Sequence, residues 1–113
     1  MTIKDQKEAQ DKISQLQMIE QNVHGFLVQK QGLQTQILEI DNALTELGKT
    51  DEAYRIVGSI MVRSKPEELK EDLESKKKMA DMRLKSIERQ EEKMKEKAQS
   101  LQKDVLALLK EEA

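Results

Sequence analysis

Apolar residues recur with a spacing of seven along two long stretches of the chain, on either side of a short central segment. With Leu16 at position a of a heptad, the apolar a and d positions of the first stretch are Leu16, Ile19, Val23, Phe26, Leu33, Ile37, Ile40, Leu44 and Leu47. Only Lys30 interrupts them. In the second stretch every d position is apolar, namely Leu73, Ala80, Ile87, Met94, Leu101 and Leu108. Heptads sustained over this length predict two long helices that form a coiled coil.

The two heptad patterns mirror each other about Gly58 and Ser59. If the chain folds back there, facing residues have numbers that sum to about 117. An a residue then meets a d residue in each apolar layer: Leu16–Leu101, Ile19–Ala98, Val23–Met94, Leu33–Leu84, Ile37–Ala80 and Leu44–Leu73. The mirror predicts a long antiparallel two-stranded coiled coil, a helical hairpin, within one chain. Four layers place a charged side chain on the seam: Phe26–Glu91, Lys30–Ile87, Ile40–Lys77 and Leu47–Lys70.

Composition supports a thin, extended structure that is dominated by α-helix. The chain has 113 residues, of which 37% are charged, and it contains one Tyr, one Phe and no Trp. This length predicts a single domain over 1–113. So few aromatic residues suit a narrow seam better than a compact core. High charge with low aromatic content is also typical of disordered chains, but regular heptads favour folded helices.

The central segment has the composition of a β-hairpin at about residues 52–63. Gly58-Ser59 separates two short runs of β-branched and aromatic residues, with glycine first, as a type II′ turn prefers. Alternation places Ala53, Arg55, Val57, Ile60 and Val62 on one face, and Tyr54, Ile56, Met61 and Arg63 on the other. Both faces are largely apolar, and a lone hairpin is marginally stable in water. We expect a sheet completed by hairpins of other subunits; a hairpin that caps its own coil is the alternative.

Local signals set the expected bounds of the helices. The first helix is expected from about residue 3 to residue 47, with Thr2 and Asp5 as a weak N-cap signal. Gly48 follows where a left-handed C-terminal residue belongs. The second helix is expected from about 65 to 110, with Ser64 and Glu67 at capping-box spacing. Helices of nearly equal length should bring both chain termini to one tip.

Catalytic chemistry is not indicated by any motif. There is no HExxH, no phosphate-binding glycine loop and no CxxC, and the lone histidine, His24, falls at an outward b position. We therefore expect neither an enzyme nor a bound cofactor or metal. A net charge of −2 argues against nucleic acid and anionic membranes as partners. No apolar stretch approaches a membrane span, the N-terminus lacks a signal-peptide core, and the absence of Cys suits a cytoplasmic protein.

Apolar residues near both termini exceed what the seam needs. The candidate tip residues are Ile13, Leu16, Met18, Leu101, Val105, Leu106, Leu108 and Leu109. A narrow coil should leave part of this set exposed, and exposed apolar clusters often mark interaction sites. The tip could therefore hold the apolar surface of another protein, whereas ordinary packing at a fraying end is the alternative.

The central segment between matched helices resembles one protein family. Tyr54-Arg55-Ile56-Val57-Gly58-Ser59-Ile60-Met61-Val62 is similar to the hairpin of beta-type prefoldin subunits in their archaeal form. The stretch Ile87-Glu88-Arg89-Gln90-Glu91-Glu92 is similar to the same family, and the resemblance covers essentially the whole chain. Alpha-type subunits carry two hairpins, whereas this chain has one.

The resemblance implies a hexamer of two alpha-type and four beta-type subunits, whose hairpins join in β-barrels. Carried onto this chain, assembly falls on Tyr54, Ile56, Val57, Ile60, Met61 and Val62. The implied activity is ATP-independent capture of unfolded polypeptides at the coiled-coil tips, followed by delivery to a group II chaperonin. The alternative is a structural coiled-coil scaffold that docks one specific protein partner.

Overall fold

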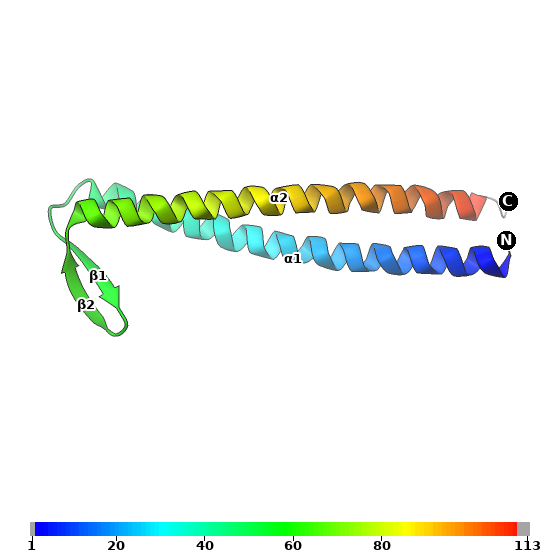
Figure 1. Cartoon of the computed structure of the whole chain (residues 1–113), viewed down its shortest axis with the longest axis horizontal. Helices are drawn as coiled ribbons and strands as arrows, with labels where there is room; N and C mark the ends of the chain where they lie inside the picture. Colours follow the sequence, from blue (N-terminus) through cyan, green and yellow to red (C-terminus); the bar gives the residue numbers. More distant parts are fainter. Residues whose placement is uncertain (1, 111–113) are drawn as a thin grey trace. The chain divides into compact units, whose positions relative to one another are not determined.

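A computed structural model describes residues 2–110 of the chain, as two long helices separated by a β-hairpin (Figure 1). Helix α1 spans Ile3–Leu47, strand β1 Ala53–Val57, strand β2 Ile60–Ser64 and helix α2 Pro66–Lys110. Two compact units contain these elements. The terminal unit comprises the chain up to Gln29 and from Ser86 onward, and the hairpin unit comprises Lys30–Lys85. In each unit a segment of α1 runs antiparallel to a segment of α2, which confirms the predicted fold class.

Local hydrogen bonds set the start of α1. The Asp5 backbone N–H donates to Thr2 Oγ1 at 3.1 Å, and the Thr2 backbone N–H donates to Asp5 Oδ2 at 3.3 Å. These reciprocal bonds satisfy backbone donors that the first helical turn leaves without a partner. The Asp5 carboxylate also lies at the positive end of the helix dipole.

Gly48 and Ser64 do not have the helix-capping roles that the sequence predicted. Among the described residues only Gly58 has a positive φ, so the expectation of a left-handed Gly48 was wrong. Helix α1 ends instead in a tightening turn, in which the Lys49 N–H donates to the Glu46 carbonyl at 3.0 Å. Ser64 is the last residue of β2, paired with Ala53, and therefore lies outside the α2 cap. The Lys65 carbonyl accepts a hydrogen bond from the Leu69 N–H at 3.2 Å.

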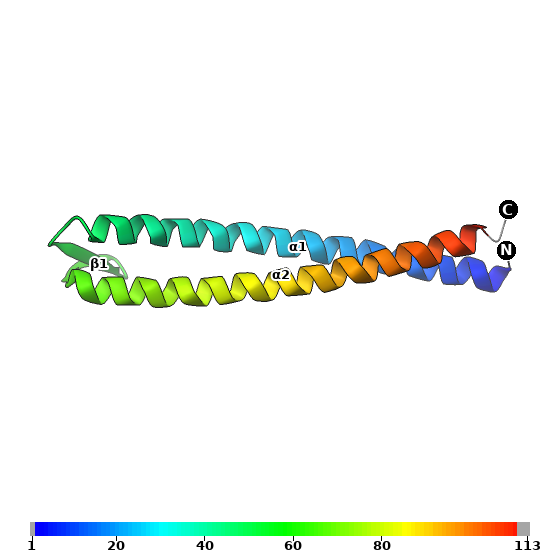
Figure 2. The same cartoon turned by 90° about the horizontal axis from the view of Figure 1, so that it is seen from above.

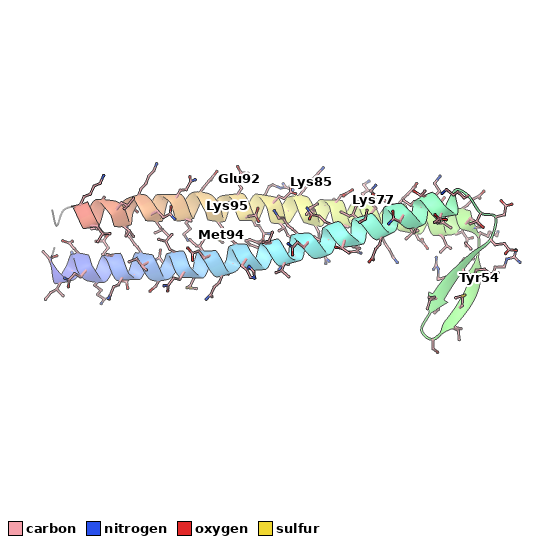
Figure 3. The ribbon with its side chains drawn as sticks, turned by 180° about the vertical axis from the view of Figure 1, so that it is seen from behind. Tyr54, Lys77, Lys85, Glu92, Met94 and Lys95 are labelled. Atoms are coloured by element: carbon pink, nitrogen blue, oxygen red, sulfur yellow. The ribbon has the colours of Figure 1, made fainter. Side chains whose placement is uncertain are left out.

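The terminal unit has a narrow apolar seam. Ala9, Ile19, Leu101 and Val105 are buried in it. Figures 1 and 2 both show the start of α1 beside the end of α2. An ion pair also crosses between the helices here, with Lys12 Nζ 3.0 Å from Asp104 Oδ2. Figure 3 shows Met94 on the side of α2 toward α1, and Glu92 on the opposite side.

One carboxylate is held within this seam. Glu91 is 9% exposed, and the predicted register places it opposite Phe26. Lys95 Nζ, one helical turn later, lies 3.5 Å from Glu91 Oε1. A charged group in an apolar seam carries a desolvation cost that its ionic partners offset. It also favours one axial alignment of the helices, because a shifted register would place the charge differently.

The hairpin unit has a comparably thin core. Its buried apolar residues are Ile40, Ala53 and Ala80. Among the described residues no side chain is less than 2% exposed, so burial is shared among many partly covered layers. In the predicted Ile40–Lys77 layer, Lys77 Nζ donates to Asp41 Oδ1 at 2.5 Å. This hydrogen bond and the negative charge of Asp41 raise the pKa of Lys77 above its ordinary value of 10.5.

The Lys77–Asp41 interaction gives a pH-dependent prediction. A raised folded-state pKa means that the Lys77 ammonium stabilises the fold below its unfolded pKa near 10.5 and loses this effect as pH rises through the folded pKa. A double-mutant cycle of Lys77→Gln and Asp41→Asn, followed by thermal unfolding, should show favourable coupling at pH 8 that decreases in alkaline solution. Coupling that is unchanged beyond the folded pKa would contradict the assignment.

The seam itself can be tested with two neighbouring residues. Ile40 is 6% exposed, whereas Leu38 is 60% exposed. Ile40→Ala should lower the free energy of unfolding by about 2–4 kcal/mol, because it removes buried methyl groups and leaves a cavity. Leu38→Ala should change it by about 0.5 kcal/mol or less. Denaturant titration followed by circular dichroism measures both, and equal effects would refute the proposed seam.

Candidate protein-binding surfaces

The β-hairpin presents apolar side chains on both faces. Its strands pair antiparallel, with Val57 opposite Ile60 and Tyr54 opposite Arg63. Gly58 has a φ of 63° and Ser59 has a negative φ, as a type II′ turn requires. All six residues predicted for assembly are exposed: Tyr54, Ile56, Val57, Ile60, Met61 and Val62. Ile56 is 72% exposed and Met61 is 67% exposed, so this surface is available to a partner.

The hairpin contacts the helices mainly near its base. Ala53 is its only buried residue, and Ser64 beside it is partly covered. Arg55 of β1 forms an ion pair with Asp72 of α2, which holds the strand against the helix. Figure 1 shows the turn of the hairpin extending away from the neighbouring helix ends. The strands are therefore not covered by their own coil.

A groove of about 490 Å³ lies where the hairpin meets the helices. Its apolar lining residues are Ala43, Leu47, Ala53, Tyr54, Met61, Leu69 and Leu73. Glu46, Thr50 and Glu52 also line it. Figure 3 places Tyr54 on the hairpin beside the helix ends. The Tyr54 face of the hairpin thus contributes to a concave apolar surface.

The eight predicted tip residues divide by burial. Ile13, Met18, Leu106 and Leu109 are exposed. Leu16 and Leu108 are partly buried. Leu101 and Val105 are buried in the seam, because α1 packs over them, and they have little surface for a partner. The structure therefore leaves four side chains of the set accessible in the terminal unit.

Several exposed apolar residues were not among the predicted sites. They are Ile3, Leu27, Val28, Leu38, Met79 and Met82. The heptad register could have identified three of them as exposed. Leu27, Val28 and Leu38 fall at e, f and b, outside the a and d positions. An apolar residue at an outward position should be exposed in a two-stranded coil.

The described residues contain no cluster of metal-binding side chains. Within 2–110, no group of three or more His, Cys, Asp or Glu side chains could hold a metal ion. His24 is exposed and lies near Gln17, Glu20 and Gln21 on α1. Over the same range, neither helix contains a segment that is both long and apolar enough to span a bilayer.

Comparison with known proteins identifies the family. A family model described as "Prefoldin subunit" matches residues 10–112. The chain belongs to the prefoldin family. Its similarity is to beta subunits: prefoldin subunit beta of Archaeoglobus fulgidus is 31% identical over 109 residues, which cover 94% of each chain. Prefoldin subunit beta of Methanosarcina barkeri is 33% identical over 108 residues, covering 93% of this chain and 92% of that one.

A solved structure supports the same relationship. The crystal structure of the prefoldin beta subunit from Thermococcus strain KS-1 is similar with a TM-score of 0.82 and 28% identity. The match covers 88% of this prefoldin chain and 90% of that one. Sequence and structure therefore agree along nearly the whole chain, which confirms the resemblance to beta-type prefoldin subunits.

Proposed function

We propose that this chain, as a single prefoldin-like domain over 1–113, is a beta-type subunit of an ATP-independent hexameric chaperone. The observation that carries the proposal is a hairpin with exposed apolar residues on both faces, in a member of the prefoldin family. A second observation is the exposed apolar cluster in the terminal unit. These surfaces would serve assembly and capture respectively, so the chain acts by binding and not by catalysis.

Assembly would use the hairpin. Its backbone edges offer unpaired N–H and C=O groups to further strands, and its exposed side chains offer apolar area to bury. The proposed complex contains two alpha-type and four beta-type subunits, with the hairpins joined in β-barrels. Burial of Ile56 and Ile60 would supply much of the favourable free energy, because each is well exposed in the single chain.

Client capture would use the exposed tip residues. Ile13, Leu106 and Leu109 offer small apolar contacts, and Met18 adds a flexible side chain that adapts to different surfaces. Several tips acting on one unfolded polypeptide would bind it with high avidity although each contact is weak. Weak single contacts also permit release to the proposed recipient, a group II chaperonin in the cytoplasm.

The hairpin role predicts a loss of assembly in one variant. Ile56→Asp should release free subunits, because a carboxylate in a buried sheet interface would lose its hydration. Size-exclusion chromatography with light scattering, in the presence of the partner subunits, measures the mass of the complex. Glu74→Ala, an exposed change on α2, is the control and should preserve that mass. A full-sized complex from Ile56→Asp would refute the barrel role.

The tip role predicts a loss of client protection without a loss of assembly. The triple variant Ile13→Ser, Leu106→Ser and Leu109→Ser should require at least about tenfold more protein to suppress aggregation of a denatured enzyme. The matched control, Val28→Ser with Leu38→Ser and Met82→Ser, removes exposed apolar residues outside the tip. Light scattering of the client measures the effect.

Three outcomes of the tip experiment separate the hypotheses. Loss of protection in the tip variant alone supports capture at the tip. Equal protection by the tip variant and the parent chain would exclude it. Stoichiometric binding of one native protein, with no protection of denatured ones by the parent chain, would instead favour a coiled-coil scaffold.

A further inference from the structure

A shallow groove along the coil of the hairpin unit is used by neither proposed surface. Its volume is about 270 Å³, and Leu33 and Gln36 of α1 line one side. The other side is formed by α2, through Lys76, Met79, Ala80 and Arg83. Leu33 and Ala80 belong to the apolar seam and form an apolar base. The groove thus follows one edge of the two-helix seam.

The charge of this groove is entirely positive. Lys76 and Arg83 are its only charged lining residues. Among the described residues, neither side chain takes part in an ion pair or a hydrogen bond. Asp72, one turn before Lys76, is already paired with Arg55. Two cations therefore remain available to an acidic ligand, whereas neighbouring Lys77 is held by Asp41.

The spacing of Lys76 and Arg83 suits a second helix that lies alongside α2. Lys76 and Arg83 are seven residues apart on α2, which corresponds to a rise of about 10 Å. Met79 lies between them and is 66% exposed. A second helix laid alongside would present acidic residues seven apart to the two cations, with an apolar residue between them on Met79. The apolar contact adds to the electrostatic one because thioether side chains adapt to their partners.

A second copy of this chain does not fit this pattern. The described part of α2 carries acidic residues seven apart at Glu67 and Glu74, at Glu74 and Asp81, and at Asp81 and Glu88. Lys70 lies within the first pair, and Lys77 and Lys78 lie within the second, where an apolar side chain is needed. Leu84 lies between Asp81 and Glu88, but it belongs to the seam and is partly buried, so it has little surface with which to cover Met79. Charge pattern and burial together favour a different protein as the occupant.

We propose that the groove between Lys76 and Arg83 binds an acidic amphipathic helix of a partner protein. The binding helix carries Asp or Glu at positions i and i+7, with Leu or Met at i+3 or i+4. Its carboxylates pair with Lys76 and Arg83, and its apolar residue covers Met79. This site acts independently of the hairpin and of the tip.

The experiment measures binding of a synthetic helix to the full chain. The probe is a fluorescein-labelled peptide of alanine and glutamine, with glutamates seven apart and a leucine three residues after each glutamate. Fluorescence anisotropy gives its affinity at low ionic strength. Lys76→Gln with Arg83→Gln should weaken binding by at least about tenfold. Lys78→Gln with Lys85→Gln removes the same charge at the same spacing on α2 and should have little effect.

Two further measurements separate the site from general electrostatics. Met79→Ser should weaken binding several-fold without changing the net charge, and a probe with alanine in place of leucine should show the same loss. Equal weakening of peptide binding by the Lys76–Arg83 and Lys78–Lys85 double variants would overturn the proposal. An absence of peptide binding to the parent chain would also overturn it. Client protection and complex mass should be unchanged in Lys76→Gln with Arg83→Gln, so failure here is distinct from failure of the chaperone proposal.

Discussion

The apolar seam between two antiparallel helices is the interaction on which the whole structure depends. Neither helix has a compact core to pack on, and no described side chain is fully buried. Stability therefore comes from many layers that are each partly covered, such as those of Ile19, Ile40 and Ala80. Within each unit the seam requires one register, because a shift would place apolar residues on the outer faces. The central turn sets that register by fixing where the chain reverses.

Charges within and beside the seam refine the register. Glu91 is buried in the terminal unit near Lys95, and Lys77 bonds to Asp41 in the hairpin unit. Lys12 and Asp104 connect α1 to α2 near their outer ends. Exposed ion pairs contribute little stability individually, since water and salt screen them. The pairs that join α1 to α2, Lys77–Asp41 and Lys12–Asp104, add specificity, because they form only when the helices are correctly aligned.

Much of this architecture could be predicted from the sequence because it follows from periodic patterns. Heptads give the seam, and the glycine of Gly58-Ser59 gives the turn and the strand faces. The conformation of Gly48 could not be predicted, because a helix end can close with either a left-handed residue or a tighter turn. Likewise, the burial of Leu101 and Val105 depends on how α1 covers them, whereas Leu106 projects outward. The Lys76–Arg83 groove depends on which cations find partners, and spacing alone does not decide that.

The joint between hairpin and coil has a consequence for how firmly subunits are oriented. Among the described residues, the buried methyl of Ala53 and the Arg55–Asp72 ion pair link the strands to the helices, and Tyr54 and Met61 line the adjoining groove. The ion pair is partly exposed, so dissolved salt screens it, whereas the apolar contact of Ala53 involves no charge that salt could screen. We therefore expect the hairpin to be held less firmly at high ionic strength, where the ion pair is screened and the Ala53 contact remains.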